Sequence, residues 1–79
     1  MRTATTMQEI FARILDVPAA HLTDDSNPAT IDRWDSLAQM RLIMTFEDFY
    51  RITFTTSEIR TLKSLGDFRQ TLARKGLSV

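Results

Sequence analysis

The 79-residue chain contains no cysteine, one histidine, two glycines and two prolines. Without cysteine it can form neither a disulfide nor a zinc finger, and it has no thiol nucleophile of its own. One histidine excludes a histidine-rich metal site, and two glycines are too few for a glycine-rich phosphate loop. No apolar run approaches the roughly 18 residues that span a membrane. Residues 1–6 lack the basic and then apolar order of a secretory signal, so we expect a cytoplasmic protein.

The overall composition is that of an ordinary globular domain, with 43% apolar and 25% charged residues. A chain this short has room for one domain, which we place over residues 1–79. Ten basic residues balance ten acidic ones, which argues against a nucleic-acid-binding function. The charges nevertheless segregate along the chain, since residues 16–48 hold seven acids and two bases, whereas residues 49–79 hold two acids and six bases.

A first helix is predicted from Met7 to about Asp16. Thr6 and Glu9 have the spacing of a capping box at its start, and Pro18 ends it because proline restricts the residue before it. The apolar residues that form one face of this helix are Met7, Ile10, Phe11, Ile14 and Leu15.

The stretch from residue 17 to residue 35 has no helical or strand periodicity and is predicted to be a long loop. Its Asp24-Asp25-Ser26-Asn27-Pro28 segment is typical of turns. An EF-hand calcium loop is excluded, because counting from Asp24 puts Ala29 and Asp35 where glycine and glutamate are needed. A loop this long in so small a domain suggests a functional role.

Three further helices are predicted after this loop. The second runs from about Ser36 to Tyr50, capped by Asp35 or Ser36, and has apolar residues on more than one face. A short third helix at 56–61 and a last helix from Leu65 to about Lys75 follow, each opened by capping-box spacing. The predicted fold is therefore an all-α four-helix bundle, with three main helices, one short helix and a long first loop.

Catalysis by this chain alone is not expected. Ser36 and His21 could join an aspartate in a triad only on paper, because nothing in the sequence orients the histidine. A domain of this size also has little room for an oxyanion hole and a substrate cleft. Ser36 instead lies where a helix begins, beside a carboxylate, and unpaired helix N–H groups tolerate a phosphate ester at such a position.

The segment Asp35-Ser36-Leu37 opens a helix whose later residues include Met40, Leu42, Ile43, Met44, Phe46, Glu47, Asp48 and Tyr50. This pattern resembles the attachment region of acyl carrier proteins, which have an Asp-Ser-Leu signature before an apolar helix closed by acids and an aromatic residue. The resemblance extends over nearly the whole chain, including the long loop and the short third helix.

The resemblance implies that a phosphopantetheinyl transferase moves 4′-phosphopantetheine from coenzyme A onto Ser36, with Asp35 helping to position the metal ion of that transferase. The arm ends in a thiol, which would let a chain without cysteine carry acyl or aminoacyl groups as thioesters. The implied partners are a loading ligase and downstream transferases or synthases. The protein would be a monomeric carrier and not an enzyme.

The resemblance also implies where partners and cargo bind. The docking residues would be Leu37, Met40, Arg41, Met44 and Trp34. The cargo would enter a cavity among the helices, for which the candidate lining residues are Phe11, Met40, Phe46, Ile52, Ile59 and Phe68. We expect the Trp34 ring to lie against the loop and the start of the second helix, where it would fix the approach to Ser36.

The chain departs from fatty-acid carriers, which are usually strongly acidic, in its zero net charge and in having Arg41 on the helix after the serine. This difference favours a dedicated carrier of a specialised biosynthetic pathway, in which Arg41 selects partners with acidic or neutral docking surfaces. Alternatively, Arg41 pairs with Glu47, Asp48 or a loop acid and selects nothing. Two other functions stay open: an unmodified helical interaction module, and a DNA-binding domain, against which the neutral charge weighs.

Overall fold

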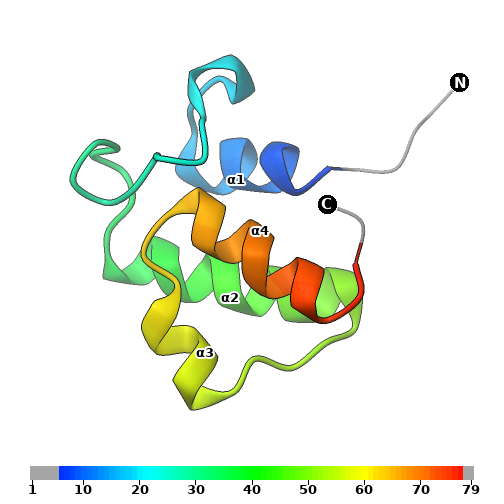
Figure 1. The fold of residues 1–79 in the computed structure, drawn as a ribbon. Helices are drawn as coiled ribbons and strands as arrows, with labels where there is room; N and C mark the ends of the chain where they lie inside the picture. The colour runs from blue at the N-terminus through cyan, green and yellow to red at the C-terminus, as the bar shows by residue number, and fades with distance from the viewer. Residues whose placement is uncertain (1–5, 78–79) are drawn as a thin grey trace, which may run out of the picture.

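A computed structural model describes residues 6–77 as helices joined by ordered links (Figure 1). The α-helices are α1 (Met7–Leu15), α2 (Ser36–Tyr50), α3 (Thr56–Thr61) and α4 (Leu65–Arg74), and a 3-10 turn, η1, spans Ala19–His21. No strand occurs in this range. The predicted all-α fold and the bounds of its four helices are confirmed, whereas η1 inside the long loop was not predicted.

Side-chain caps explain where the helices begin. Thr6 and Glu9 form a capping box at α1, Thr55 and Glu58 form another at α3, and Ser64 caps α4. The side chain of Asp35, and not that of Ser36, caps α2. Each of these caps satisfies an N–H group that the first turn of a helix leaves without a partner.

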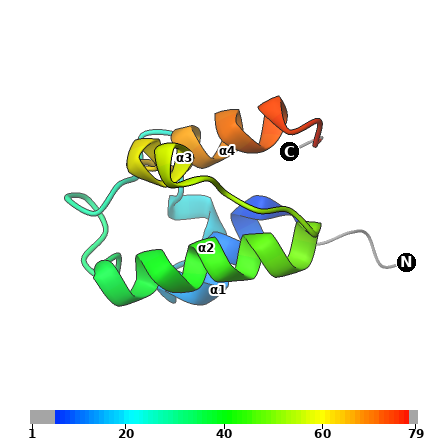
Figure 2. The same ribbon diagram turned by 90° about the horizontal axis from the view of Figure 1, so that it is seen from below.

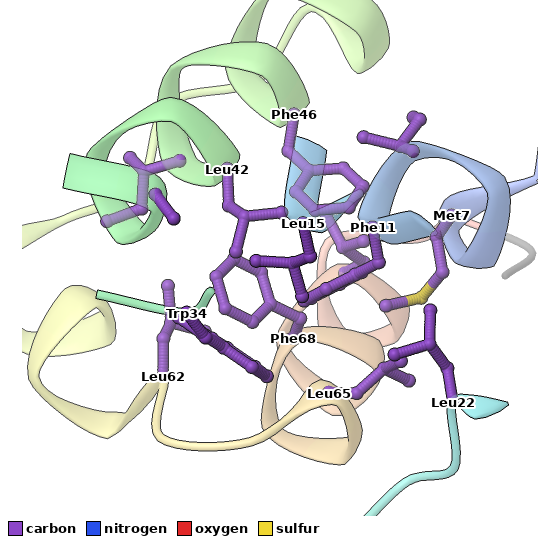
Figure 3. Close-up of a cluster of buried hydrophobic side chains, with 14 of the residues drawn as sticks. Met7, Phe11, Leu15, Leu22, Trp34, Leu42, Phe46, Leu62, Leu65 and Phe68 are labelled. Carbon is purple, nitrogen blue, oxygen red and sulfur yellow. The ribbon is translucent and has the colours of Figure 1, made fainter. Parts of the chain in front are cut away.

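The helices enclose one apolar core, in which α1 packs against α2 and α4 lies across the other side (Figures 1 and 2). Four aromatic residues form its centre, each of them at most 2% exposed: Phe11, Trp34, Phe46 and Phe68. The Phe11 ring centroid lies 5.3 Å from that of Trp34, 5.4 Å from that of Phe46 and 5.0 Å from that of Phe68 (Figure 3). Offset and edge-to-face ring pairs at such distances stabilise a core beyond the area that they bury.

The long loop is held against the start of α4. The backbone N–H groups of Leu65 and Gly66 donate to the carbonyl oxygens of Ser26 and Asp24, both over 2.9 Å. Gly66 permits this approach, because a Cβ atom there would lie 3.0 Å from the Asp24 carbonyl oxygen. Arg69 adds an ion pair with the Asp24 carboxylate at 3.1 Å. These contacts fix the path by which the chain returns to α2.

Candidate functional site

Ser36 is the first residue of α2 and is exposed to solvent. Its predecessor Asp35 has extended backbone, and one carboxylate oxygen of Asp35 accepts a hydrogen bond of 2.8 Å from the Ala38 N–H. The Ser36 hydroxyl has no hydrogen bond within residues 6–77. Because the neighbouring carboxylate caps the helix, the hydroxyl is left free to react at a helix start with positive partial charge.

The second carboxylate oxygen of Asp35 accepts no hydrogen bond from the described part of the chain. Asp35 is also exposed, so this oxygen faces solvent beside Ser36. The one side chain therefore holds the helix start with one oxygen and leaves the other without a hydrogen-bond partner among residues 6–77. Sequence reasoning identified both residues of this pair, but it did not separate their structural tasks.

Trp34 occupies a different position from the one required for docking. Only 2% of it is exposed, and its ring packs against Phe11 and, at 6.4 Å between centroids, against Phe68. A partner protein cannot contact a side chain so deeply buried, so the prediction of Trp34 as a docking residue is wrong. The apolar ring stabilises the fold more when it is buried in the aromatic core than it would at the surface of the loop.

Gln39 connects this buried tryptophan to the segment after α3. Its side-chain oxygen accepts a 2.7 Å hydrogen bond from Trp34 Nε1, and its side-chain nitrogen donates over 2.9 Å to the Leu62 carbonyl. The sequence analysis overlooked Gln39. Its position one helical turn after Ser36 was a usable signal, but its partner Leu62 lies 23 residues away and no local pattern indicates it.

A hollow of about 650 Å³ opens beside Ser36, between the start of α2 and the segment that joins α3 to α4. Its lining residues are Pro28, Trp34, Asp35, Ser36, Gln39, Met40, Leu62 and Lys63. The lining combines buried apolar side chains, Trp34 and Leu62, with exposed polar ones, Asp35, Ser36 and Lys63, which is the mixture typical of sites that bind small ligands.

Of the six residues predicted to line a cargo cavity, only Met40 lines this hollow. Phe11, Phe46 and Phe68 have no exposed surface, and their rings contact one another, so they fill the space that the prediction left for cargo. Ile52 packs at the edge of the core, and Ile59 is 37% exposed. None of these five residues lines the hollow beside Ser36, because aromatic packing fills the centre of the bundle, and their contact with cargo stays a prediction.

The outer face of α2 carries an apolar stripe. Leu37, Met40 and Met44 recur at helical spacing, and they are 63%, 53% and 61% exposed. Arg41 lies beside them and is also exposed, without an ion pair to any of residues 6–77. The alternative in which Arg41 pairs with Glu47, Asp48 or a loop acid is therefore wrong for this structure.

A second, smaller hollow of about 220 Å³ lies beside Asp35, next to Leu37 and Arg41. Its lining residues are Ile14, Arg33, Asp35, Leu37, Ala38 and Arg41. Ser36 thus lies near two hollows that share Asp35.

No three His, Cys, Asp or Glu residues in the described range are grouped as a metal site. Within the same range, no helix has the length and apolar character needed to cross a bilayer.

Comparison with known proteins agrees with this geometry. Residues 5–72 match the model of the family described as "Phosphopantetheine attachment site". A solution structure of holo acyl carrier protein from Geobacter metallireducens is 37% identical, with a TM-score of 0.73 over 87% of this chain and 84% of that one. A candidate acyl carrier protein from Mycobacterium tuberculosis, at 24% identity, shares the fold with a TM-score of 0.74 over 89% and 99% of the two chains. The curated proteins contain no match.

Proposed function

The chain belongs to the phosphopantetheine-attachment family of acyl carrier proteins, and from this premise we propose that Ser36 is its attachment residue. A member of this family carries covalently bound 4′-phosphopantetheine, whose terminal thiol holds a cargo as a thioester. The single observation that carries the assignment to Ser36 is its exposed hydroxyl, free of hydrogen bonds within the described chain, at the start of α2.

The geometry around Ser36 fits such a group. A phosphodiester on Oγ would lie beside the first N–H groups of a 15-residue helix, which favour negative charge. The adjoining hollow of about 650 Å³ has room for a flexible arm along Met40 and Leu62. In the attachment step the Ser36 oxygen forms a bond to the β-phosphorus of coenzyme A, adenosine 3′,5′-bisphosphate leaves with the electron pair, and a base of the transferase takes the hydroxyl proton.

We assign Asp35 two tasks in that step. One carboxylate oxygen holds the helix start, and the free oxygen helps to position the metal ion of the transferase. Carboxylate oxygen is a preferred ligand of magnesium, and one or two carboxylates commonly complete a site that phosphates already occupy.

We further propose that the protein shuttles its cargo between enzymes of a specialised biosynthetic pathway and is not itself an enzyme. The partners would be a loading ligase and downstream transferases or synthases, which dock on Leu37, Met40, Arg41 and Met44. The exposed apolar stripe supports this role, because methionine side chains adapt to different surfaces. The zero net charge and the exposed Arg41 favour partners other than those of a strongly acidic carrier.

The decisive experiment mixes the protein with coenzyme A, magnesium and a permissive phosphopantetheinyl transferase, followed by intact mass measurement. The expected result is a gain of one phosphopantetheine in the parent and none in Ser36→Ala. Ser57→Ala, which removes an exposed serine of α3, is the matched control and should be modified like the parent. No gain with several transferases would overturn the proposal and favour an unmodified interaction module that uses the same apolar stripe.

A further inference from the structure

Four of the seven acids in residues 16–48 are engaged within the protein, whereas Asp25, Asp32 and Asp48 are exposed and form no ion pair with residues 6–77. Asp16 pairs with Arg33 at 3.1 Å, and Asp24 pairs with Arg69 at the same distance. The Glu47 carboxylate accepts a 2.9 Å hydrogen bond from the Phe54 N–H. Asp35 caps α2. The three unpaired acids line neither of the two hollows near Ser36, so the acidic stretch of the sequence does not make the lining of these hollows equally acidic.

Two cations near Ser36 remain unpaired. Arg41 lines the smaller hollow together with Leu37, and Lys63 lines the larger hollow together with Met40. Both side chains are exposed, and neither forms an ion pair with residues 6–77. Arg33 adds a third positive charge to the smaller hollow, although it is shared with Asp16. Asp35 is the one acid that lines either hollow.

The exposed stripe therefore adjoins both hollows, since Met40 lines the larger one with Lys63 and Leu37 lines the smaller one with Arg41. We propose that this face binds proteins whose docking surface has an apolar centre and an acidic rim. The inference rests on the proposed function for the role of Ser36, and it adds the chemistry of the partner. Charge complementarity at the rim chiefly selects partners and speeds their association, while the apolar centre supplies contact area.

A membrane surface would also attract cations beside apolar side chains, but this face is a poor match for one. Recognition of anionic lipids typically uses clusters of about four to eight lysines or arginines. The two hollows together contribute Arg33, Arg41 and Lys63, and Asp35 lies among them. A protein rim with a few carboxylates is the better complement to this number and spacing of charges.

The test is an NMR titration of ¹⁵N-labelled protein, apo and holo, with two synthetic amphipathic helical peptides. Both peptides carry the same leucine face, which is flanked by glutamates in one and by lysines in the other. At low salt the glutamate peptide should bind at least about threefold more tightly and shift the resonances of Leu37, Met40 and Met44. The preference should shrink at about 0.5 M salt, because screening weakens exposed charge pairs.

Arg41→Glu and Lys63→Glu should each reduce that preference by about two- to fivefold. Arg74→Glu is the matched control, since it makes the same charge change on an exposed residue at the far end of α4 and should leave the preference unchanged (Figure 1). Thermal melting of each variant verifies its fold, and Arg41→Gln gives a milder second test at the same position.

Three results would overturn the inference: equal or tighter binding of the lysine peptide, a preference that disappears in the holo protein, or binding to vesicles of anionic phospholipid without discrimination between the peptides. The second would mean that the two cations serve the phosphodiester of the arm. Failure of Ser36 modification would contradict the proposed function alone. The titration of apo protein does not require the modification, so it would still test the docking inference.

Discussion

The two faces of α2 carry similar apolar residues, but those on one face are buried and those on the other face are exposed. On the inner face, Leu42 and Phe46 are completely buried, whereas on the outer face Leu37 and Met44 are more than 60% exposed. Burial of a large apolar side chain stabilises a fold by roughly 1.5–3 kcal/mol, so the inner face accounts for the position of the helix. The outer stripe contributes little to folding, and an exposed apolar patch of this kind is the basis for the proposed contact with other proteins.

The largest effect is expected when one side chain on each face of α2 is replaced by alanine. Phe46→Ala should lower the free energy of unfolding by about 3–5 kcal/mol, because it leaves a cavity among three aromatic rings. Met44→Ala should change it by less than about 0.5 kcal/mol and slow the modification of Ser36 instead. Urea unfolding and the rate of mass gain measure the two effects. Equal destabilisation by both substitutions would contradict the division of α2 into two faces.

The second test concerns Gln39, which joins the core to the segment after α3. Gln39→Leu should cost about 1–3 kcal/mol, because the Trp34 Nε1–H and the Leu62 carbonyl both lose their partner. Gln39→Glu keeps an acceptor for the tryptophan and should recover part of the loss. Tryptophan fluorescence during urea unfolding follows both variants. A Gln39→Leu protein as stable as the parent would mean that water replaces both bonds.

The third test separates the two tasks of Asp35 beside the outer face. Asp35→Ala should cost about 1 kcal/mol of stability, since it removes the cap of α2. Asp35→Asn retains a capping oxygen, so its free energy of unfolding should remain within a few tenths of a kcal/mol of that of the parent. It should nevertheless slow modification, because the negative charge is lost. Thermal melting and transferase kinetics provide the measurements. If Asp35→Asn were modified as fast as the parent, Asp35 would be a cap and nothing more.

The smallest expected effect concerns the pair of Glu58 and Lys75, neither of which lines the hollows near Ser36. The Lys75 ammonium, 2.9 Å from the Glu58 carboxylate, lowers the pKa of Glu58 below its ordinary 4.5 by donating a hydrogen bond to it. A carboxylate whose pKa is lower in the folded state stabilises the fold above about pH 4.5, and this contribution is lost as the pH falls through the lowered value.

The melting temperature of the parent should therefore exceed that of Glu58→Gln slightly at pH 7, and the difference should shrink as the pH falls below 4.5 and disappear once Glu58 is protonated in the folded protein. The effect is small because solvent reaches both side chains. The apolar stripe on α2 should bind its probes equally well in the two proteins at pH 7. A difference in melting temperature that persists at low pH would show that the substitution acts through packing or capping instead of charge.

Most of the helical framework could be predicted because its signals are local. The cap at Thr6 acts on Glu9, and the cap at Thr55 acts on Glu58, each over three residues. The cap at Asp35 or Ser36 and the apolar residues up to Tyr50 predicted the bounds of α2, and the Asp-Ser-Leu segment is the sequence basis for proposing Ser36 as the attachment residue. The burial of Trp34 could not be predicted in this way, since an aromatic residue before a helix suits either the surface or the core.

The amino-acid sequence by itself determined the four helices, most of their caps and the place of a serine at the start of α2, because these depend on residues within one helical turn of each other. The tertiary structure decided the rest of the site. It closed the centre of the bundle with Phe11, Phe46 and Phe68, and it brought Lys63 to one side of Ser36 and left Arg41 unpaired on the other. Contacts such as Asp24 with Arg69, 45 residues apart, depend on how the helices pack, and no local pattern carries that information.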